Sequence, residues 1–256
     1  MRRTSTGPAT GVIVTGGASG IGLASARALA EDGRPVALWD LQGHVAETEA
    51  KSISAAFGVP ALGLAVDLTR PAQYGAAIAR SREVLGSLGG LVHAAGIVDT
   101  ASIEGITEAS WAAGIDTHLR PLALLTRDLL PDLAGNPGSA IVAIASINAT
   151  LGNAMNPIYS AAKGGMLSLV RSLADRLAHD GIRINTVSPG VIRTPMTQPA
   201  LDHLPAGTFE RRVLLGRLGE PEEIGRVVRF LLSEEASYVT AAELVVDGGN
   251  ISSQRV

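Results

Sequence analysis

The feature that most constrains the fold is a glycine-rich segment between a short strand and a helix. Residues 11–15 (GVIVT) are rich in β-branched side chains and indicate a strand, whereas residues 23–31 carry a helical pattern. Residues 15–22 (TGGASGIG) join the two. Glycines permit a tight turn and close backbone approach, and the N-terminus of a helix favours a pyrophosphate group. The segment therefore predicts the strand–turn–helix unit of a dinucleotide site.

An acidic residue ends the second expected strand. The apolar run at residues 35–39 stops at Asp40, 24 residues after Gly16. A carboxylate there can accept hydrogen bonds from both hydroxyls of a ribose and would repel a 2′-phosphate. Leu41 offers no cation beside it, and Arg34 precedes the strand instead of following it. The alternative is that Asp40 is an ordinary turn residue.

One of the three tyrosines and one of the two lysines stand four residues apart, as Tyr159 and Lys163. Asn156 followed by proline is typical of an N-cap and a first helical residue, so the pair shares one face of a helix that runs to about residue 178. A phenol beside an ammonium in a cleft is a proton donor and acceptor with a lowered pKa. Ser146 follows an apolar run, at a strand end where open α/β sheets bind ligands. The alternative is a half-buried tyrosine and a solvated lysine.

The chain alternates strand and helix patterns throughout. This indicates an α/β fold, a single-domain Rossmann-type doubly wound parallel sheet of about seven strands with helices on both faces. Expected strands lie near 12–15, 35–40, 61–66, 90–93, 138–145, 182–187 and 243–246, and expected helices near 20–31, 43–57, 71–86, 108–133, 157–179 and 221–232. Pro121 could kink the fourth helix.

The expected catalytic domain covers residues 11–250. It lies between a disordered N-terminal tail, residues 1–10, and a C-terminal tail, residues 251–256. Residues 193–216 contain three prolines and little periodicity, so we expect a substrate loop or lid there.

Composition excludes several classes of function. The chain is 46% hydrophobic, yet no run approaches the roughly 18 apolar residues of a membrane span. A net charge of −3 and a pI near 6.0 give no basic footprint for nucleic acid. The lack of cysteine excludes disulfides and thiolate metal sites. Because the N-terminus also lacks an apolar signal region, we expect a cytoplasmic protein with no membrane or nucleic-acid partner.

Together these motifs resemble the short-chain dehydrogenase/reductase family from Val12 to Gly249. The glycine segment matches the family's TGxxxGxG turn, and Ser146, Tyr159 and Lys163 match its catalytic Ser…Tyr-x-x-x-Lys pattern. Further landmarks are Asp67 with Leu68 at the adenine position, Ala94 to Gly96 at a strand end, Asn185 to Gly190 with Thr194 beside the nicotinamide, Arg217 to Glu223, and Asp247 to Gly249.

The resemblance implies an NAD(H)-dependent oxidoreductase that interconverts a secondary alcohol and a ketone. Tyr159 would be the general acid or base, Lys163 would favour the phenolate and bind the nicotinamide ribose, and Ser146 would hold the substrate oxygen. Asp40 favours NAD, as does Ser19, where phosphate-preferring relatives often carry arginine or lysine. The implied cofactor-binding residues are Gly16, Ser19, Gly20, Ile21, Gly22, Asp40, Leu41, Asp67, Leu68, Ala94, Ala95, Gly96, Tyr159, Lys163, Pro189, Gly190, Ile192 and Thr194.

Two histidines depart from the family pattern. His118 stands where the family usually has an asparagine that is thought to support a water-linked proton path behind the lysine. Histidine titrates near neutral pH, so His118 could relay protons from Lys163 and add an ionisation there; alternatively it packs or caps the local backbone. His93 replaces a strand-end asparagine, and we expect it to bond backbone between strands. With no evident third ligand, the two form no metal site. The other histidines, expected on the surface or in the lid, are His44, His179 and His203.

Other hypotheses stay open. An NADP-dependent 3-oxoacyl-carrier-type reductase is one, and a cofactor-binding protein without catalysis is another. The expected substrate wall comprises Ile147, Asn148, Asn153, Met155 and the lid from Met196 to Phe209. Small residues at 161, 162, 164 and 165 would let the catalytic helix approach a second copy closely. Because relatives pair this helix across a two-fold axis, we expect a homotetramer, with a dimer as the fallback.

Overall fold

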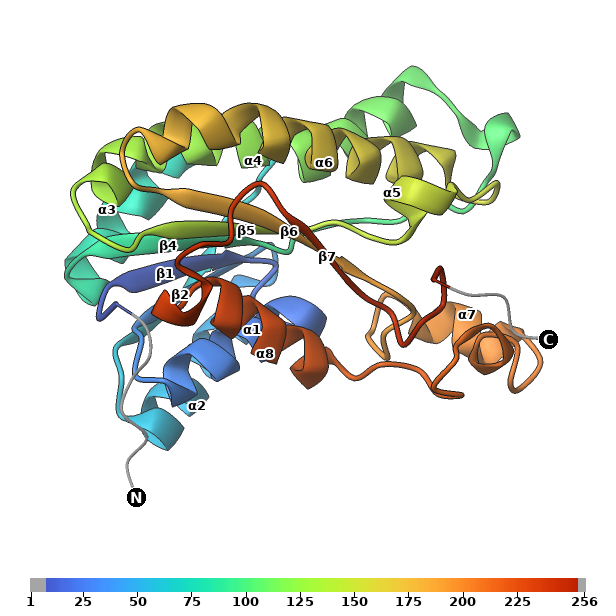
Figure 1. The fold of residues 1–256 in the computed structure, drawn as a ribbon, viewed down its shortest axis with the longest axis horizontal. Coiled ribbons are helices and arrows are strands. Elements are labelled where there is room, and N and C mark those ends of the chain that lie inside the picture. Colours follow the sequence, from blue (N-terminus) through green and yellow to red (C-terminus); the bar gives the residue numbers. More distant parts are fainter. Residues whose placement is uncertain (1–7, 253–256) are drawn as a thin grey trace.

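The computed structural model describes residues 8–252. Its centre is one parallel sheet of seven strands in the order β3-β2-β1-β4-β5-β6-β7 (Figure 1). The strands are β1 (Gly11–Thr15), β2 (Val36–Asp40), β3 (Ala61–Ala65), β4 (Leu88–His93), β5 (Ala140–Ile144), β6 (Arg183–Pro189) and β7 (Glu243–Val246). The chain builds outward from β1 to β3 and then returns to β4 on the other side of β1. This confirms the predicted doubly wound topology.

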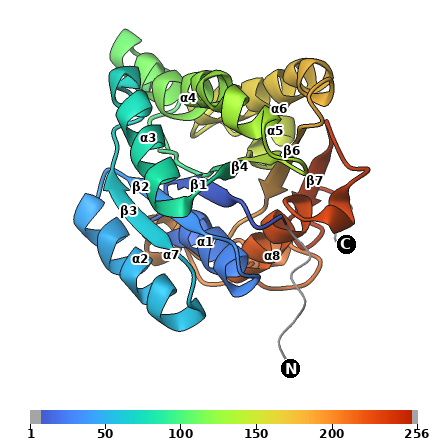
Figure 2. The same ribbon diagram turned by 90° about the vertical axis from the view of Figure 1, so that its left-hand side faces the viewer.

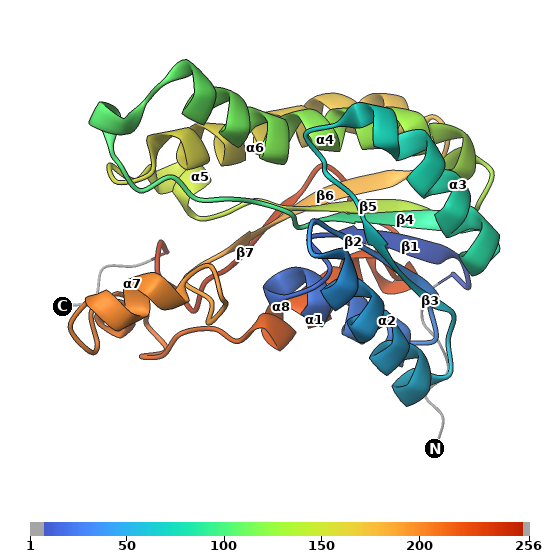
Figure 3. The ribbon, with the colours of Figure 1, turned by 180° about the vertical axis from the view of Figure 1, so that it is seen from behind.

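Helices cover both faces of the sheet. They are α1 (Gly20–Glu31), α2 (Gly43–Phe57), α3 (Tyr74–Leu85), α4 (Glu108–Ala134), α5 (Asn148–Leu151), α6 (Pro157–Ala178), α7 (Gln198–His203) and α8 (Pro221–Leu231). Helices α3, α4 and α6 lie on one face, and α1, α2 and α8 on the other (Figures 1 and 2). The short helices α5 and α7 extend past one end of the sheet, above and below it (Figure 3).

The central strands are apolar along their whole length because both of their faces are buried. Ile13 and Leu91 belong to the core cluster under α4 and α6, and their neighbours Val14 and Val92 belong to the cluster under α1 and α8. All four are fully buried. Burying each such side chain contributes roughly 1.5–3 kcal/mol. The two clusters together cover both faces of the sheet and hold its strands in place.

Several local expectations need correction. The third helix, expected from residue 71, begins with a 3-10 turn, Pro71–Gln73, before α3. Neither α5 nor α7 was expected, and α7 and the 3-10 turn Glu210–Arg212 lie inside the predicted lid. Helix α4 continues through Pro121, and a kink there stays a prediction.

The predicted tails are described only in part. Most of both lies outside the described residues. Thr10, assigned to the disordered tail, is held in place, because its carbonyl accepts a 3.0 Å hydrogen bond from the Arg34 guanidinium. At the other end, Ile251 N–H donates to the Asp247 carboxylate. Within residues 8–252, no helix has the length and apolarity that crossing a bilayer requires.

Candidate active site

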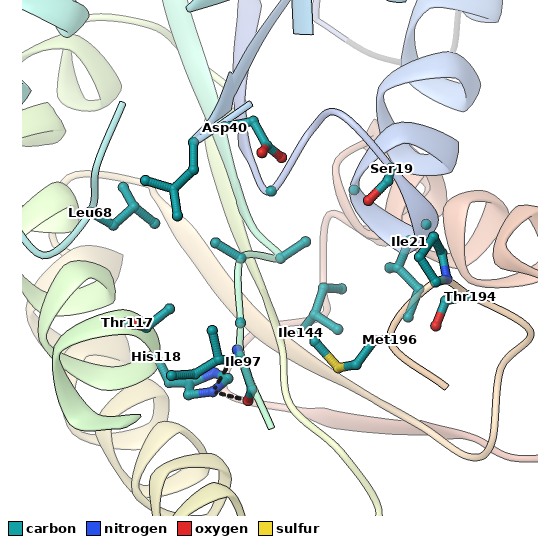
Figure 4. Close-up of a pocket in the computed structure, with 18 of the residues that line it drawn as sticks. Ser19, Ile21, Asp40, Leu68, Ile97, Thr117, His118, Ile144, Thr194 and Met196 are labelled. Carbon is teal, nitrogen blue, oxygen red and sulfur yellow. Dashed lines mark hydrogen bonds between the residues drawn. The ribbon is translucent and has the colours of Figure 1, made fainter. Parts of the chain in front are cut away.

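A cavity of about 450 Å³ opens at the carboxyl ends of the strands (Figure 4). Every residue predicted for catalysis or cofactor binding lines it, although those residues come from all parts of the chain between 16 and 194. Residues that the sequence analysis did not single out also line it: Trp39, Gln42, Val66, Thr69, Ile97, Thr117, Ile144, Ala145 and Pro195. Of the expected substrate wall, Met196 and Thr197 are among the lining residues, and the rest of that wall stays a prediction.

The glycine turn forms a cradle in which larger side chains at the glycine positions would not fit. Gly16 has a φ of +66° and Gly20 a φ of +51°, a conformation that favours glycine. A Cβ placed on Gly22 would lie 2.0 Å from the Gly16 carbonyl oxygen. The turn therefore requires glycine at these places, and it presents the N-terminus of α1 to the cavity. Both properties suit a pyrophosphate group.

Asp40 is fixed by backbone hydrogen bonds at the end of β2. Its carboxylate accepts one from Ala18 N–H in the glycine turn, at 3.1 Å, and one from Gln42 N–H, at 3.0 Å. Each carboxylate oxygen retains lone pairs for a further donor. Arg34 lies far from this point, since its guanidinium is buried and donates to Thr10 and to the Leu232 carbonyl. The nearest arginine in sequence therefore offers no cation beside Asp40.

Asp67 follows β3 at the same end of the cavity. Its carboxylate accepts hydrogen bonds from the hydroxyl and the backbone N–H of Thr69, which lower its pKa. The Gln73 side chain accepts a bond from Asp67 N–H at 2.9 Å. This network holds the adjacent Leu68 in the cavity wall, where Figure 4 shows it opposite the glycine turn.

Lys163 is buried beneath the predicted catalytic tyrosine. Its Nζ donates a 2.5 Å hydrogen bond to the Ile144 carbonyl at the end of β5 and lies 5.5 Å from the centroid of the Tyr159 ring. Burial lowers the pKa of Lys163 to about 7. A lysine with that pKa is only partly charged near neutral pH, so it attracts a phenolate weakly.

The expected lowering of the Tyr159 pKa is therefore not found. Burial raises the pKa of the phenol, and a hydrogen bond with Ser146 acts in the opposite direction. The sequence analysis considered the charge of Lys163 but not the desolvation of both groups, and desolvation is the larger effect on each. Ser146 itself is ordered by a 3.1 Å hydrogen bond from Asn148 N–H.

His93 is a fully buried link between β1 and α4. Its Nε2 donates to the His118 carbonyl at 2.8 Å, so Nδ1 is left to accept from the Thr15 hydroxyl at 2.9 Å. Burial lowers its pKa to about 4. The predicted structural role is confirmed, but the bonds reach a helix backbone and a side chain rather than backbone between strands.

His118 is buried too, which contradicts the expected ionisation near neutral pH. Burial and then the charge of Lys163 lower its pKa to about 2. Its Nε2 donates to the Ile97 carbonyl at 2.8 Å, its ring packs edge-on against Tyr159 with centroids 5.4 Å apart, and its buried Nδ1 has no partner within the described residues. The alternative of a packing residue that bonds local backbone fits this environment. His44, His179 and His203 are exposed, as expected.

The start of α6 contains a contact that the sequence analysis missed. The Asn156 side chain does not cap the helix, because its Oδ1 instead accepts from Asn148. The carboxylate of Asp99, in the loop after β4, accepts from the N–H groups of Ile158, at 3.2 Å, and Tyr159, at 2.9 Å. No local pattern signals this contact, because it joins residues about 60 positions apart.

The segment after β6 contributes Gly190, Ile192 and Thr194 to the cavity lining. Gly190 N–H donates to the Val246 carbonyl, which ties this turn to β7. Thr197 Oγ1 donates to the Ile192 carbonyl and accepts from Thr194 N–H, so the segment is braced internally before α7 begins. Among residues 8–252, no cluster of histidine or acidic side chains could hold a metal ion.

Comparisons with known proteins agree on one family. Residues 16–250 match the family described as Enoyl-(Acyl carrier protein) reductase. The 3-alpha-(or 20-beta)-hydroxysteroid dehydrogenase of Mycobacterium tuberculosis is 34% identical over 94% of this chain and 88% of its own. The cis-4-hydroxycyclohexanecarboxylate dehydrogenase of Sinomonas cyclohexanicum is 39% identical over 93% of this chain and 94% of its own.

Solved structures resemble the whole chain. L-sorbose reductase from Gluconobacter frateurii, complexed with NADPH and L-sorbose, superposes with a TM-score of 0.89 at 29% identity, over 99% of this chain and all of the other. A 3-ketoacyl-(acyl-carrier-protein) reductase from Brucella melitensis, complexed with NADH, gives 0.87 at 28% identity, over 95% and 98% of the two chains. The two neighbours carry different nicotinamide cofactors.

Proposed function

The chain belongs to the short-chain dehydrogenase/reductase family, oxidoreductases that act on CH–OH groups with a nicotinamide cofactor, and we propose that it is an NAD(H)-dependent enzyme for a secondary alcohol and its ketone. The observation that carries the proposal is the convergence of Ser146, Tyr159 and Lys163 on the cavity that the glycine turn lines. A cytoplasmic location stays a prediction.

The cavity fits a dinucleotide. The glycine cradle suits the pyrophosphate, Asp40 would bind the adenine-side ribose, and Asp67 with Leu68 would border the adenine. Lys163 would bind the second ribose, and the turn around Gly190 would hold the carboxamide. The cofactor supplies the chemistry of hydride acceptance and donation. The protein supplies positioning and proton transfer.

Proton transfer falls to Tyr159. Its phenol gives a proton to the carbonyl oxygen in reduction and takes one from the hydroxyl in oxidation. The Ser146 hydroxyl, whose oxygen accepts a bond from Asn148 N–H, would donate its hydrogen bond to the substrate oxygen instead of to the phenol. Lys163 is held by the Ile144 carbonyl, so its other N–H groups remain for the ribose and the phenol.

NAD preference rests on charge. Asp40 brings a carboxylate to the place of the adenine ribose, and no cation within the described residues lines this end of the cavity. A 2′-phosphate would meet repulsion with no compensating partner. We propose that NAD(H) is preferred by at least tenfold in kcat/KM, about 1.4 kcal/mol.

The reacting end of the cavity is apolar. The cavity lining includes the apolar side chains of Ile97, Ile144 and Met196, which Figure 4 labels. The acidic lining residues within the described chain, Asp40 and Asp67, stand at the adenine end. We propose an uncharged substrate with an apolar body, since an anionic group would find no cationic partner other than the buried Lys163.

The test compares three proteins in steady-state assays with NADH and NADPH over a panel of ketones and alcohols. Asp40→Ala and Asp40→Asn both remove the charge, but asparagine keeps a hydrogen-bond acceptor for the ribose. If repulsion sets the preference, both variants gain activity with NADPH, and Asp40→Asn keeps more activity with NADH. Equal or better use of NADPH by the unmodified protein would contradict the cofactor proposal.

A second candidate is a 3-oxoacyl-carrier-type reductase. The description of the matching family and the Brucella melitensis neighbour favour it. Such an enzyme would reduce a 3-oxoacyl thioester faster than any small ketone in the panel. A preference for simple alicyclic ketones would exclude it.

A homotetramer, with a dimer as the fallback, is our proposal for the assembly. On α6, Ala161 is exposed and Gly164 is partly exposed, so a second helix could approach closely there, whereas Ala162 is fully buried and Gly165 faces Leu119 of α4. Relatives of this family pair the same helix across a two-fold axis.

A further inference from the structure

A three-residue segment after β4 contacts the surroundings of Tyr159 at both of its ends. At one end, the Ile97 carbonyl accepts a 2.8 Å hydrogen bond from His118 Nε2. At the other, the Asp99 carboxylate accepts bonds from Ile158 N–H and Tyr159 N–H at 3.2 and 2.9 Å. Residues 97–99 therefore connect α4 to the first turn of α6. We call them the strap.

The first turn of α6 needs an external acceptor. The first N–H groups of any helix have no partner within it. Proline at position 157 carries no N–H, and the Asn156 side chain is engaged with Asn148. The next two N–H groups belong to Ile158 and Tyr159, and one carboxylate binds both, one oxygen to each. Asp99 thus acts on the backbone of the tyrosine itself.

The other end of the strap acts on the tyrosine ring. His118 is 1% exposed, and its ring meets the Tyr159 ring edge-on at 86°. Its backbone is held by His93, and its Nε2 is held by Ile97. Because the His118 ring is fixed at both points, it forms a rigid packing surface for the Tyr159 ring. The strap thus links the backbone support of Tyr159 to the packing support of its ring.

We propose that Asp99 is a positioning residue that sets the place of the Tyr159 phenol through the strap. The proposal rests on the proposed function, in which Tyr159 transfers the proton. Asp99 is not among the residues that line the cavity. Its carboxylate fixes the backbone from which the tyrosine side chain extends, and the strap transmits the same constraint to His118.

The charge of Asp99 has a further effect that packing alone would not have. The side chains close to the phenol are those of Lys163 on its own helix, His118 on α4 and Ser146 after β5, whereas the Asp99 carboxylate lies at the helix start and binds the backbone N–H of Tyr159. The positive end of the α6 dipole favours the phenolate, and a carboxylate there opposes it. We therefore expect removal of the Asp99 charge to shift the ionisation of the phenol to lower pH.

The experiment measures steady-state kinetics against pH for Asp99→Asn and Asp99→Ala. Asparagine keeps one acceptor for the helix N–H groups, whereas alanine keeps none. The matched control is Glu104→Gln, an exposed acidic residue five positions further along the same loop. We expect Asp99→Ala to lower kcat roughly 10–10²-fold, because small misplacements of a reacting group cost that much. KM for NADH should stay within about twofold.

Asp99→Asn should restore most of kcat and move the ionisation of Tyr159 down by a few tenths of a unit to about one unit. Glu104→Gln should match the wild type in both respects. A kcat of Asp99→Ala within about threefold of Glu104→Gln, or a pH profile of Asp99→Asn identical to the wild type, would overturn the proposal.

A second measurement does not depend on the function. Amide hydrogen exchange of Ile158 and Tyr159 should be faster in Asp99→Ala than in Asp99→Asn or the wild type, because the alanine variant leaves both N–H groups without an acceptor. Unchanged exchange in all three proteins would refute the strap itself. A Tyr159→Phe variant with wild-type activity would instead refute the proposed function and leave the exchange result valid.

Discussion

The two buried histidines should make the fold sensitive to mild acid. Burial lowers the pKa of His93 to about 4 and that of His118 to about 2, whereas a histidine in an unfolded chain titrates near 6.5. As the pH falls below the unfolded value, the unfolded chain binds protons that the folded protein does not. The free energy of unfolding therefore falls with pH, and the loss continues down to each folded pKa.

The size of the effect follows from these values. Between about pH 7 and pH 5, each histidine removes about 2 kcal/mol from the free energy of unfolding, so the pair removes about 4 kcal/mol. Carboxylates add to the acid sensitivity of any protein, so a variant must isolate the share of the histidines. His118→Asn replaces the imidazole with an amide that does not titrate. It should halve the contribution of the pair.

Urea unfolding at the two pH values, at one fixed protein concentration, measures this share. The quantity compared is the difference in the free energy of unfolding between pH 7 and pH 5, since His118→Asn also changes stability at neutral pH. His203→Asn, at an exposed histidine, is the control and should behave as the wild type. An equal pH dependence in His118→Asn and the wild type would show that His118 is not held neutral by burial.

Three further outcomes are expected. Gly22→Ala should weaken NADH binding by more than about 10²-fold, because the new Cβ would collide with the Gly16 carbonyl. The control Gly75→Ala, which adds a Cβ in open space, should bind NADH as the wild type does. A fluorescence titration measures both affinities. Arg34→Met should lower the free energy of unfolding by on the order of 2–4 kcal/mol, with kcat unchanged in the folded enzyme, because it removes the donor to the buried Leu232 carbonyl. Light scattering at micromolar concentration should give the mass of a tetramer or a dimer, and a monomer would contradict the proposed assembly.

The local part of the site could be predicted from the sequence. The glycine turn, Asp40 at the end of β2, and the four-residue spacing of Tyr159 and Lys163 are short-range patterns. Their positions follow once strand and helix are assigned, because the carboxyl ends of parallel strands meet at one edge. All of these residues indeed line one cavity.

The pKa values in the site could not be predicted from the sequence, because they depend on how deeply each group is buried. The sequence places an ammonium beside a phenol and a histidine near both, which favours a lowered tyrosine pKa and a titrating histidine. The fold buries Tyr159, Lys163 and His118 together, and desolvation then has the largest effect on each pKa.

Contacts that are distant in sequence were also missed. Asn156 has the local features of a helix cap, yet the capping carboxylate comes from Asp99 in a loop after β4. The asparagine is engaged instead by Asn148. Both outcomes depend on how the loop after β4 and the loop after β5 meet at the start of α6. That meeting is a property of the assembled sheet, and no local pattern encodes it.

The most direct test of the central claim compares Tyr159→Phe with the wild type. The assay follows the absorbance of the reduced nicotinamide, with the best ketone of the panel and saturating NADH, and a parallel titration measures NADH affinity. Phenylalanine keeps the ring that packs against His118 but removes the hydroxyl. The account predicts a loss of roughly 10²–10⁴-fold in kcat with NADH affinity nearly unchanged. A variant that reduces the ketone within a few-fold of the wild-type rate would contradict the claim that Tyr159 transfers the proton.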